Sequence, residues 1–152
     1  YFATNNKYTF YTLFVDYFPA MQRILKYAAL YAGFAFIISL IREVVKDMED
    51  MEGDAKYGCT TMPIVWGIPA SKVFVAVWLI VLAGALAVVQ FYVIQLGWWL
   101  SAAYCLVAVI GPLILIYKKL RVAQVAANYH SLSNLIKIVM LTGILSMLLL
   151  KM

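Results

Sequence analysis

The chain has 152 residues, of which 66% are hydrophobic and only 12% are charged, and its formal net charge is +5. A soluble domain is usually about 45–50% apolar and about 25% charged. Here residues 73–117 contain no Asp, Glu, Lys or Arg. A soluble globular domain, a disordered chain and a basic nucleic-acid-binding surface are therefore excluded. The composition predicts an integral membrane protein.

In chain order, the sequence opens with a polar and aromatic stretch, residues 1–19, which we expect to lie outside the spans. Four apolar stretches then approach the roughly 20 residues that a spanning helix needs. We expect the spans at about residues 23–45, 73–94, 98–117 and 131–150. Gln95 to Gly97 is the only break in the uncharged run, so the second and third spans should form a tight helical hairpin.

The expected fold class is all-α, a polytopic transmembrane helical bundle that forms one membrane domain over residues 1–152. The apolar runs are too long for strands and do not alternate with polar residues, which disfavours a transmembrane barrel. Two cysteines, Cys59 in a polar loop and Cys105 in an apolar run, are expected to be unpaired structural thiols.

The basic residues predict the orientation, because Lys and Arg are retained on the cytoplasmic side. Seven of them lie between the first and second or the third and fourth spans, and four lie on the opposite side. The loop at about 46–72 is therefore expected to be cytoplasmic. We expect the protein in the plasma (inner) membrane.

Six of the seven acidic residues lie between Glu43 and Asp54. At 100° per residue, Glu43, Asp47, Asp50 and Asp54 fall within about 60° of arc on a helix. We call these four residues the acidic stripe. Glu49 is expected to point elsewhere, as is Glu52.

Like charges on one helix face repel one another, and the desolvation cost at a membrane boundary adds to this. Mg²⁺ takes oxygen ligands and usually binds through one or two carboxylates plus substrate phosphates. The stripe therefore predicts a metal and diphosphate site at the cytoplasmic end of the first span. The expected diphosphate-binding residues are Lys56, Lys46 and Arg42.

These residues resemble a known motif. Asp47-x-x-Asp50-x-x-x-Asp54, preceded by Arg42-Glu43, is similar to the second aspartate-rich motif of the UbiA-like intramembrane prenyltransferases. The family's shorter form falls on Asp50 and Asp54, and Asp47 is the additional acid of the longer form. The resemblance therefore implies that the metal ligands and catalytic residues are Asp47, Asp50 and Asp54. The motif looks most like the branch that alkylates a glyceryl phosphate ether in lipid synthesis, and quinone-ring and chlorophyll-type relatives stay open.

The resemblance implies a Mg²⁺-dependent transfer of an isoprenyl group from a prenyl diphosphate to a lipid or aromatic acceptor. The family has nine spans and two aspartate-rich motifs, and the first motif, Asn-Asp-x-x-Asp-x-x-x-Asp, does not occur in this sequence. The chain is therefore expected to be the C-terminal portion, spans six to nine. Its partner would be the N-terminal half, without which it should be inactive.

Two other functions stay open. One is a half of a cation-linked membrane transporter, although its acids would be expected near the bilayer midplane. The other is a non-catalytic membrane scaffold whose acidic loop recruits a basic partner. Among single residues, His130 is expected to be structural. Lys137 lies inside the fourth span, where it either serves function or extends to the membrane surface.

Overall fold

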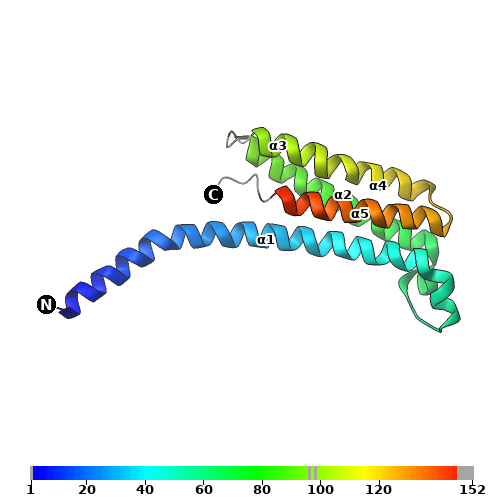
Figure 1. The fold of residues 1–152 in the computed structure, drawn as a ribbon, viewed down its shortest axis with the longest axis horizontal. Helices are drawn as coiled ribbons and strands as arrows, with labels where there is room; N and C mark the ends of the chain where they lie inside the picture. Colours follow the sequence, from blue (N-terminus) through cyan, green and yellow to red (C-terminus); the bar gives the residue numbers. More distant parts are fainter. Residues whose placement is uncertain (1, 96, 98, 147–152) are drawn as a thin grey trace. The chain divides into compact units, whose positions relative to one another are not determined.

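The computed structural model describes residues 2–95, 97 and 99–146, and gives residues 2–16 as backbone alone. Every regular element among these residues is helical, as predicted (Figure 1). The helices are α1 Phe2–Lys56, α2 Met62–Gln95, α3 Trp99–Cys105, the π-helical segment η1 Leu106–Ile110, α4 Gly111–Val122 and α5 Ala126–Leu145. The chain divides into two units, Tyr1–Phe34 and Ala35–Met152. The second unit holds the end of α1 and all the other helices.

Three of the described helical stretches are long and apolar enough to cross a membrane: Tyr17–Lys56, Met62–Gln95 and Trp99–Val122. The first three expected spans fall almost entirely within them. The expected fourth span, 131–150, is not among the three. Helix α5 covers its first part, whereas residues 147–150 lie outside the described residues, so the count of four spans stays a prediction.

The helices are longer than the apolar runs. The stretch at about 46–72, expected as the cytoplasmic loop between the first two spans, is mostly helical: α1 carries the acids through Asp54, as the predicted stripe requires, and only residues 57–61 separate α1 from α2. Its Glu, Lys, Met and Ala residues are good helix formers. Hydropathy detects where the apolar run ends, and the helix continues beyond that point.

Glycines set the turns. Gly97, with φ 77°, follows α2 where the hairpin is predicted, and its N–H donates to the Ile94 carbonyl at 2.9 Å. Inside α2, Gly67 has φ 82° and ψ 161° and joins two helical pieces at a kink. This backbone region is essentially restricted to glycine. The hydroxyl of the buried Ser71 donates to the Gly67 carbonyl at 3.0 Å, so the kink is held from within the helix.

The third membrane-crossing stretch is interrupted by η1, directly before Gly111 and Pro112. Pro112 has no N–H to donate to a carbonyl of the preceding turn. The Thr142 hydroxyl of α5 lies 2.9 Å from the carbonyl oxygen of Ala108 and can donate to it. This contact ties the π-helical segment to α5.

In the second unit, α2, α4 and α5 lie side by side (Figure 1). Their fully buried side chains include Val75, Leu79, Ile116, Leu132 and Ile136. The last part of α1 also buries apolar side chains, and these recur at helical spacing: Ile38, Ile41, Val45 and Met48. At 100° per residue this buried face lies roughly opposite the acidic stripe. The packing of α1 therefore leaves the stripe facing away from the bundle.

Candidate active site on α1

Helix α1 runs unbroken through Lys56, so the acidic residues lie on one continuous helix, as the spacing requires. Glu43 and Asp50 are exposed, and Asp47 and Asp54 are half-buried. Carboxylate oxygens are therefore presented on an accessible face. Whether they bind a metal ion is not tested by this arrangement and stays a prediction.

The carboxylates of the acidic stripe repel one another electrostatically. Burial raises the pKa of Asp47, which follows the apolar part of α1, and the negative charges of Asp54, Glu43 and Asp50 raise that pKa further. A group whose pKa is raised by neighbouring carboxylates is one whose ionised form a bound cation would stabilise. The charge arrangement therefore suits a cation.

The stripe does not form a closed metal site. Among the described residues, no three Asp, Glu, His or Cys side chains are grouped closely enough to hold a metal ion. The donor chemistry nevertheless fits Mg²⁺, which uses few protein carboxylates and completes its shell with water and substrate phosphate. The residues present therefore fit one side of a magnesium and diphosphate site.

Three basic residues predicted to bind diphosphate accompany the acids along α1. Lys46 Nζ lies 3.1 Å from Glu49 Oε1 and 3.1 Å from Asp50 Oδ2. Arg42 Nη1 lies 2.7 Å from Glu43 Oε1. Lys56 is exposed in the last turn of the helix. The structure thus places all three at the same end of α1 as the acids.

Glu49 has a role that the sequence analysis missed. It points away from the stripe, as predicted, and its side chain is only 12% exposed. His130 of α5 donates from Nδ1 to Glu49 Oε1 at 2.7 Å, while Glu49 Oε2 is buried without a hydrogen-bond partner in the described structure. Burial alone would raise the pKa of Glu49, but the hydrogen bonds from His130 and Lys46 outweigh it and lower that pKa.

The His130–Glu49 contact joins the acid-bearing end of α1 to the start of α5. His130 is the only histidine in the sequence, and its place near the start of the last apolar segment was the one signal available. Nothing in the spacing says that it meets a residue 81 positions earlier.

Glycine ends the helix that carries the site. Gly58 has φ 73°, its N–H donates to the Ala55 carbonyl at 3.3 Å, and the Cys59 N–H donates to the Asp54 carbonyl at 3.0 Å. This is a Schellman motif, in which a left-handed glycine satisfies the last carbonyls of a helix. The cap fixes the chain direction directly after Asp54 and leaves Cys59 exposed.

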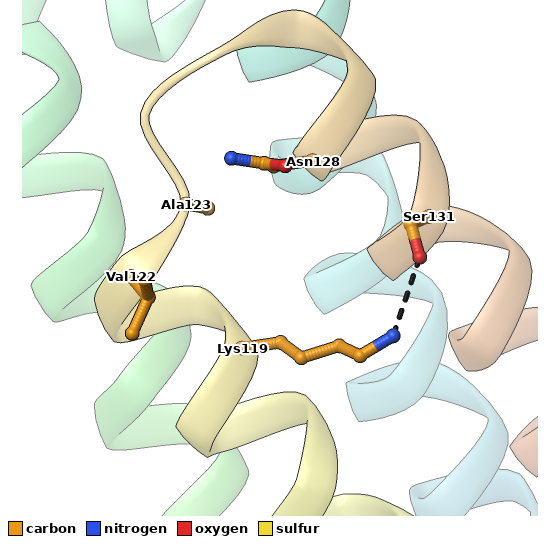
Figure 2. A pocket seen from close by; sticks show the side chains of 5 residues that line it. All are labelled: Lys119, Val122, Ala123, Asn128 and Ser131. Atoms are coloured by element: carbon orange, nitrogen blue, oxygen red, sulfur yellow. Dashed lines mark hydrogen bonds between the residues drawn. The ribbon is translucent and has the colours of Figure 1, made fainter.

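A cavity of about 190 Å³ lies where α4 turns into α5 (Figure 2). In it, Lys119 Nζ donates to Ser131 Oγ at 3.3 Å. The carbonyl of Ala123 accepts hydrogen bonds from Lys72 Nζ and from Tyr129 Oη, which ties the turn to α2. The cavity lining consists of Lys119, Val122, Ala123, Asn128 and Ser131. Since Ser131 follows His130, the cavity opens at the same end of α5 that contacts the acid-bearing helix.

Comparison with known proteins decides the family. The model of the UbiA prenyltransferase family matches residues 8–149, which is nearly the whole chain and includes every residue of the candidate site. The chain belongs to the UbiA prenyltransferase family. The predicted resemblance is therefore confirmed.

Similar proteins include several digeranylgeranylglyceryl phosphate synthases. The one from Methanosphaera stadtmanae is 30% identical over 115 residues, which cover 74% of this chain and 40% of that protein. The one from Thermococcus sibiricus is 53% identical over 38 residues, 25% of this chain and 14% of that protein. The one from Methanothermobacter thermautotrophicus is 46% identical over 55 residues, 36% of this chain and 20% of that protein.

The match thus covers less than half the length of these curated relatives. No solved structure matches the chain.

Proposed function

We propose that the full-length protein carrying this chain is a membrane-embedded, Mg²⁺-dependent transferase that moves an isoprenyl group from a prenyl diphosphate to a lipophilic acceptor. The observation that carries the proposal is the acidic stripe, held on the outward face of a helix that the family match includes. A transporter half is disfavoured because the acids gather at one helix end. A scaffold that only recruits a basic partner would not require the acids to lie on one face of the helix.

In this proposal Asp47, Asp50 and Asp54 hold Mg²⁺. The metal, when bound, neutralises the charge that develops on the leaving diphosphate as the carbon–oxygen bond breaks. The three carboxylates lie on one face of the helix, so together they would hold the metal beside the leaving diphosphate at the membrane surface.

The basic residues bind the phosphate oxygens. Arg42 offers a planar fork and Lys46 and Lys56 offer point charges. Lys46 also contacts Asp50 and Glu49. It therefore links Asp50, a proposed metal ligand, to the Glu49–His130 pair that joins α1 to α5. We infer that Lys46 keeps Asp50 oriented as well as binding diphosphate.

For the acceptor we propose a glyceryl phosphate lipid, because the relatives are named digeranylgeranylglyceryl phosphate synthase. Removing one geranylgeranyl group from the product in that name leaves geranylgeranylglyceryl phosphate. Its free hydroxyl oxygen would form the new ether bond to the allylic carbon of geranylgeranyl diphosphate. Diphosphate leaves with the bonding electron pair, and the hydroxyl proton is lost to solvent or to the leaving group.

We further propose that other parts of the polypeptide complete the site. The acids face away from the described bundle, they do not form a closed metal site by themselves, and the match covers 40% of the M. stadtmanae relative. In this proposal the motif-bearing end of α1 is cytoplasmic, and residues 1–152 alone are inactive.

The test is transfer by the full-length protein purified in detergent. It is supplied with geranylgeranyl diphosphate and geranylgeranylglyceryl phosphate, with Mg²⁺ or with excess EDTA, and the products are identified by mass spectrometry. The proposal predicts that a doubly alkylated glyceryl phosphate forms with Mg²⁺ and does not form with excess EDTA. Transfer at an equal rate in EDTA would contradict the metal dependence, and no transfer under either condition would contradict this donor and acceptor pair.

A further inference from the structure

Helix α5 has two unlike faces. Its buried face carries Leu132, Ile136 and Val139. His130, Asn134 and Lys137 are all exposed, and at 100° per residue they fall within about 60° of one another on a different side of the helix. We call these three residues the α5 polar face. It begins at the end of α5 that contacts α1 and runs into the apolar part of the helix.

Lys137 lies near the start of that apolar part. It follows Leu135 and Ile136 and is three residues beyond Asn134, which is about 5 Å along a helix. Its neighbours are Ile136 and Ile138. A charge on an apolar stretch of a membrane helix is costly, and residues of this kind mark substrate or ion sites.

The charge of Lys137 is not neutralised within the described structure. Its Nζ donates to Asn134 Oδ1 at 3.3 Å, and no described carboxylate lies within ion-pair distance of it. The nearest acid-bearing contact of α5, Glu49, is already occupied by His130 and Lys46. The α5 polar face therefore ends in an exposed cation that has no carboxylate partner among the described residues.

The pair formed by Lys137 and Asn134 also has a hydrogen-bond donor available. Because Asn134 accepts through Oδ1, its amide nitrogen is left to donate. An ammonium group beside an amide N–H suits an anion with several oxygens, and the apolar surroundings suit one that carries hydrocarbon chains. A phosphate ester on an isoprenoid lipid has both properties.

We propose that Lys137 and Asn134 bind the phosphate-bearing head group of an isoprenoid lipid substrate. The inference rests on the proposed function and adds residues of α5 to a site otherwise built on α1. The head group belongs either to the acceptor, a monophosphate, or to the donor, a diphosphate. The same assay separates these two sources when each substrate is varied in turn.

The experiment measures KM for geranylgeranyl diphosphate and for geranylgeranylglyceryl phosphate with the full-length protein in detergent. Replacing Lys137→Gln removes the charge and should raise KM for one of the two substrates about tenfold or more, the range for a charged hydrogen bond. The value of kcat should change less than about twofold. Lys137→Arg should recover most of the affinity.

A second variant tests the charge without removing the lysine. Asn134→Asp places a carboxylate against Lys137 and should raise the same KM. The matched control is Lys118→Gln, which removes an exposed lysine of α4, and KM should stay unchanged.

Direct binding separates the inference from the proposed function. The binding of each lipid to wild type and to Lys137→Gln is measured calorimetrically, without turnover. A wild-type enzyme that transfers normally, together with a variant whose KM and Kd are unchanged, would overturn the inference and leave the function intact. A decrease confined to kcat and thermal stability would also overturn it. So would a loss of lipid binding that is seen only in bilayers containing anionic phospholipid. A wild-type protein that binds these lipids yet transfers nothing would count against the proposed function alone.

Discussion

The contact between Glu49 and His130 should contribute measurably to the stability of the helix that carries the acids. The perturbation is a double-mutant cycle with Glu49→Ala, His130→Ala and the double variant in the full-length protein. The two side chains meet at 2.7 Å, with Glu49 12% exposed and His130 63% exposed. A hydrogen bond to a charged group contributes about 1.5–3 kcal/mol when buried, and exposure reduces ion pairs to about 0.2–1 kcal/mol. One partner is buried and the other is not, so we expect a coupling free energy of about 1 kcal/mol.

The assay is equilibrium unfolding in mixed detergent micelles, followed by circular dichroism. Glu49→Ala should cost more than His130→Ala, because it also removes the contact with Lys46, and the cycle subtracts that difference. The control cycle uses Arg42 and Glu43, adjacent residues of one helix that also meet at 2.7 Å. Its coupling should stay below about 0.5 kcal/mol. Additive effects of Glu49 and His130, within about 0.3–0.5 kcal/mol, would refute the view that this pair joins α1 to α5.

Two further predictions concern the segment between α1 and α2 and the kink of α2 at Gly67. Cys59 is exposed after the cap of α1, so in intact cells a membrane-impermeant maleimide should leave it unlabelled and should label it after lysis; rapid labelling from outside would reverse the proposed orientation. Gly67→Ala should destabilise the protein by about 1–3 kcal/mol, because its φ of 82° and ψ of 161° lie in a glycine-only region. Unfolding measured beside Gly84→Ala, at a helical position with open space around a new Cβ, checks this, and equal stability of the two variants would contradict it.

The sequence predicted those parts of the structure that depend on one helix at a time. The acidic stripe needs only the helical period, which α1 keeps through Lys56. The turn near Gly97 follows from local backbone chemistry. For these features no knowledge of neighbouring helices is necessary.

Contacts between helices could not be predicted in this way. The Glu49–His130 pair depends on how α1 and α5 are rotated against each other, and the periodicity of one helix carries no such information. The same holds for Thr142, whose hydroxyl reaches the Ala108 carbonyl of η1.

The central claim is that the acidic stripe holds Mg²⁺ for the departure of diphosphate. The most direct measurement is the Mg²⁺ dependence of geranylgeranyl transfer by the full-length protein, compared among Asp50→Asn, Asp54→Asn and the control Glu52→Gln. Glu52 is exposed and predicted to point away from the stripe, so its variant should keep wild-type kcat and the wild-type Mg²⁺ requirement. We predict that either aspartate variant lowers kcat/KM at least about 100-fold, the scale for losing one electrostatic stabiliser of the transition state, while the protein still inserts into membranes. Wild-type turnover with an unchanged Mg²⁺ requirement in both aspartate variants would contradict the claim.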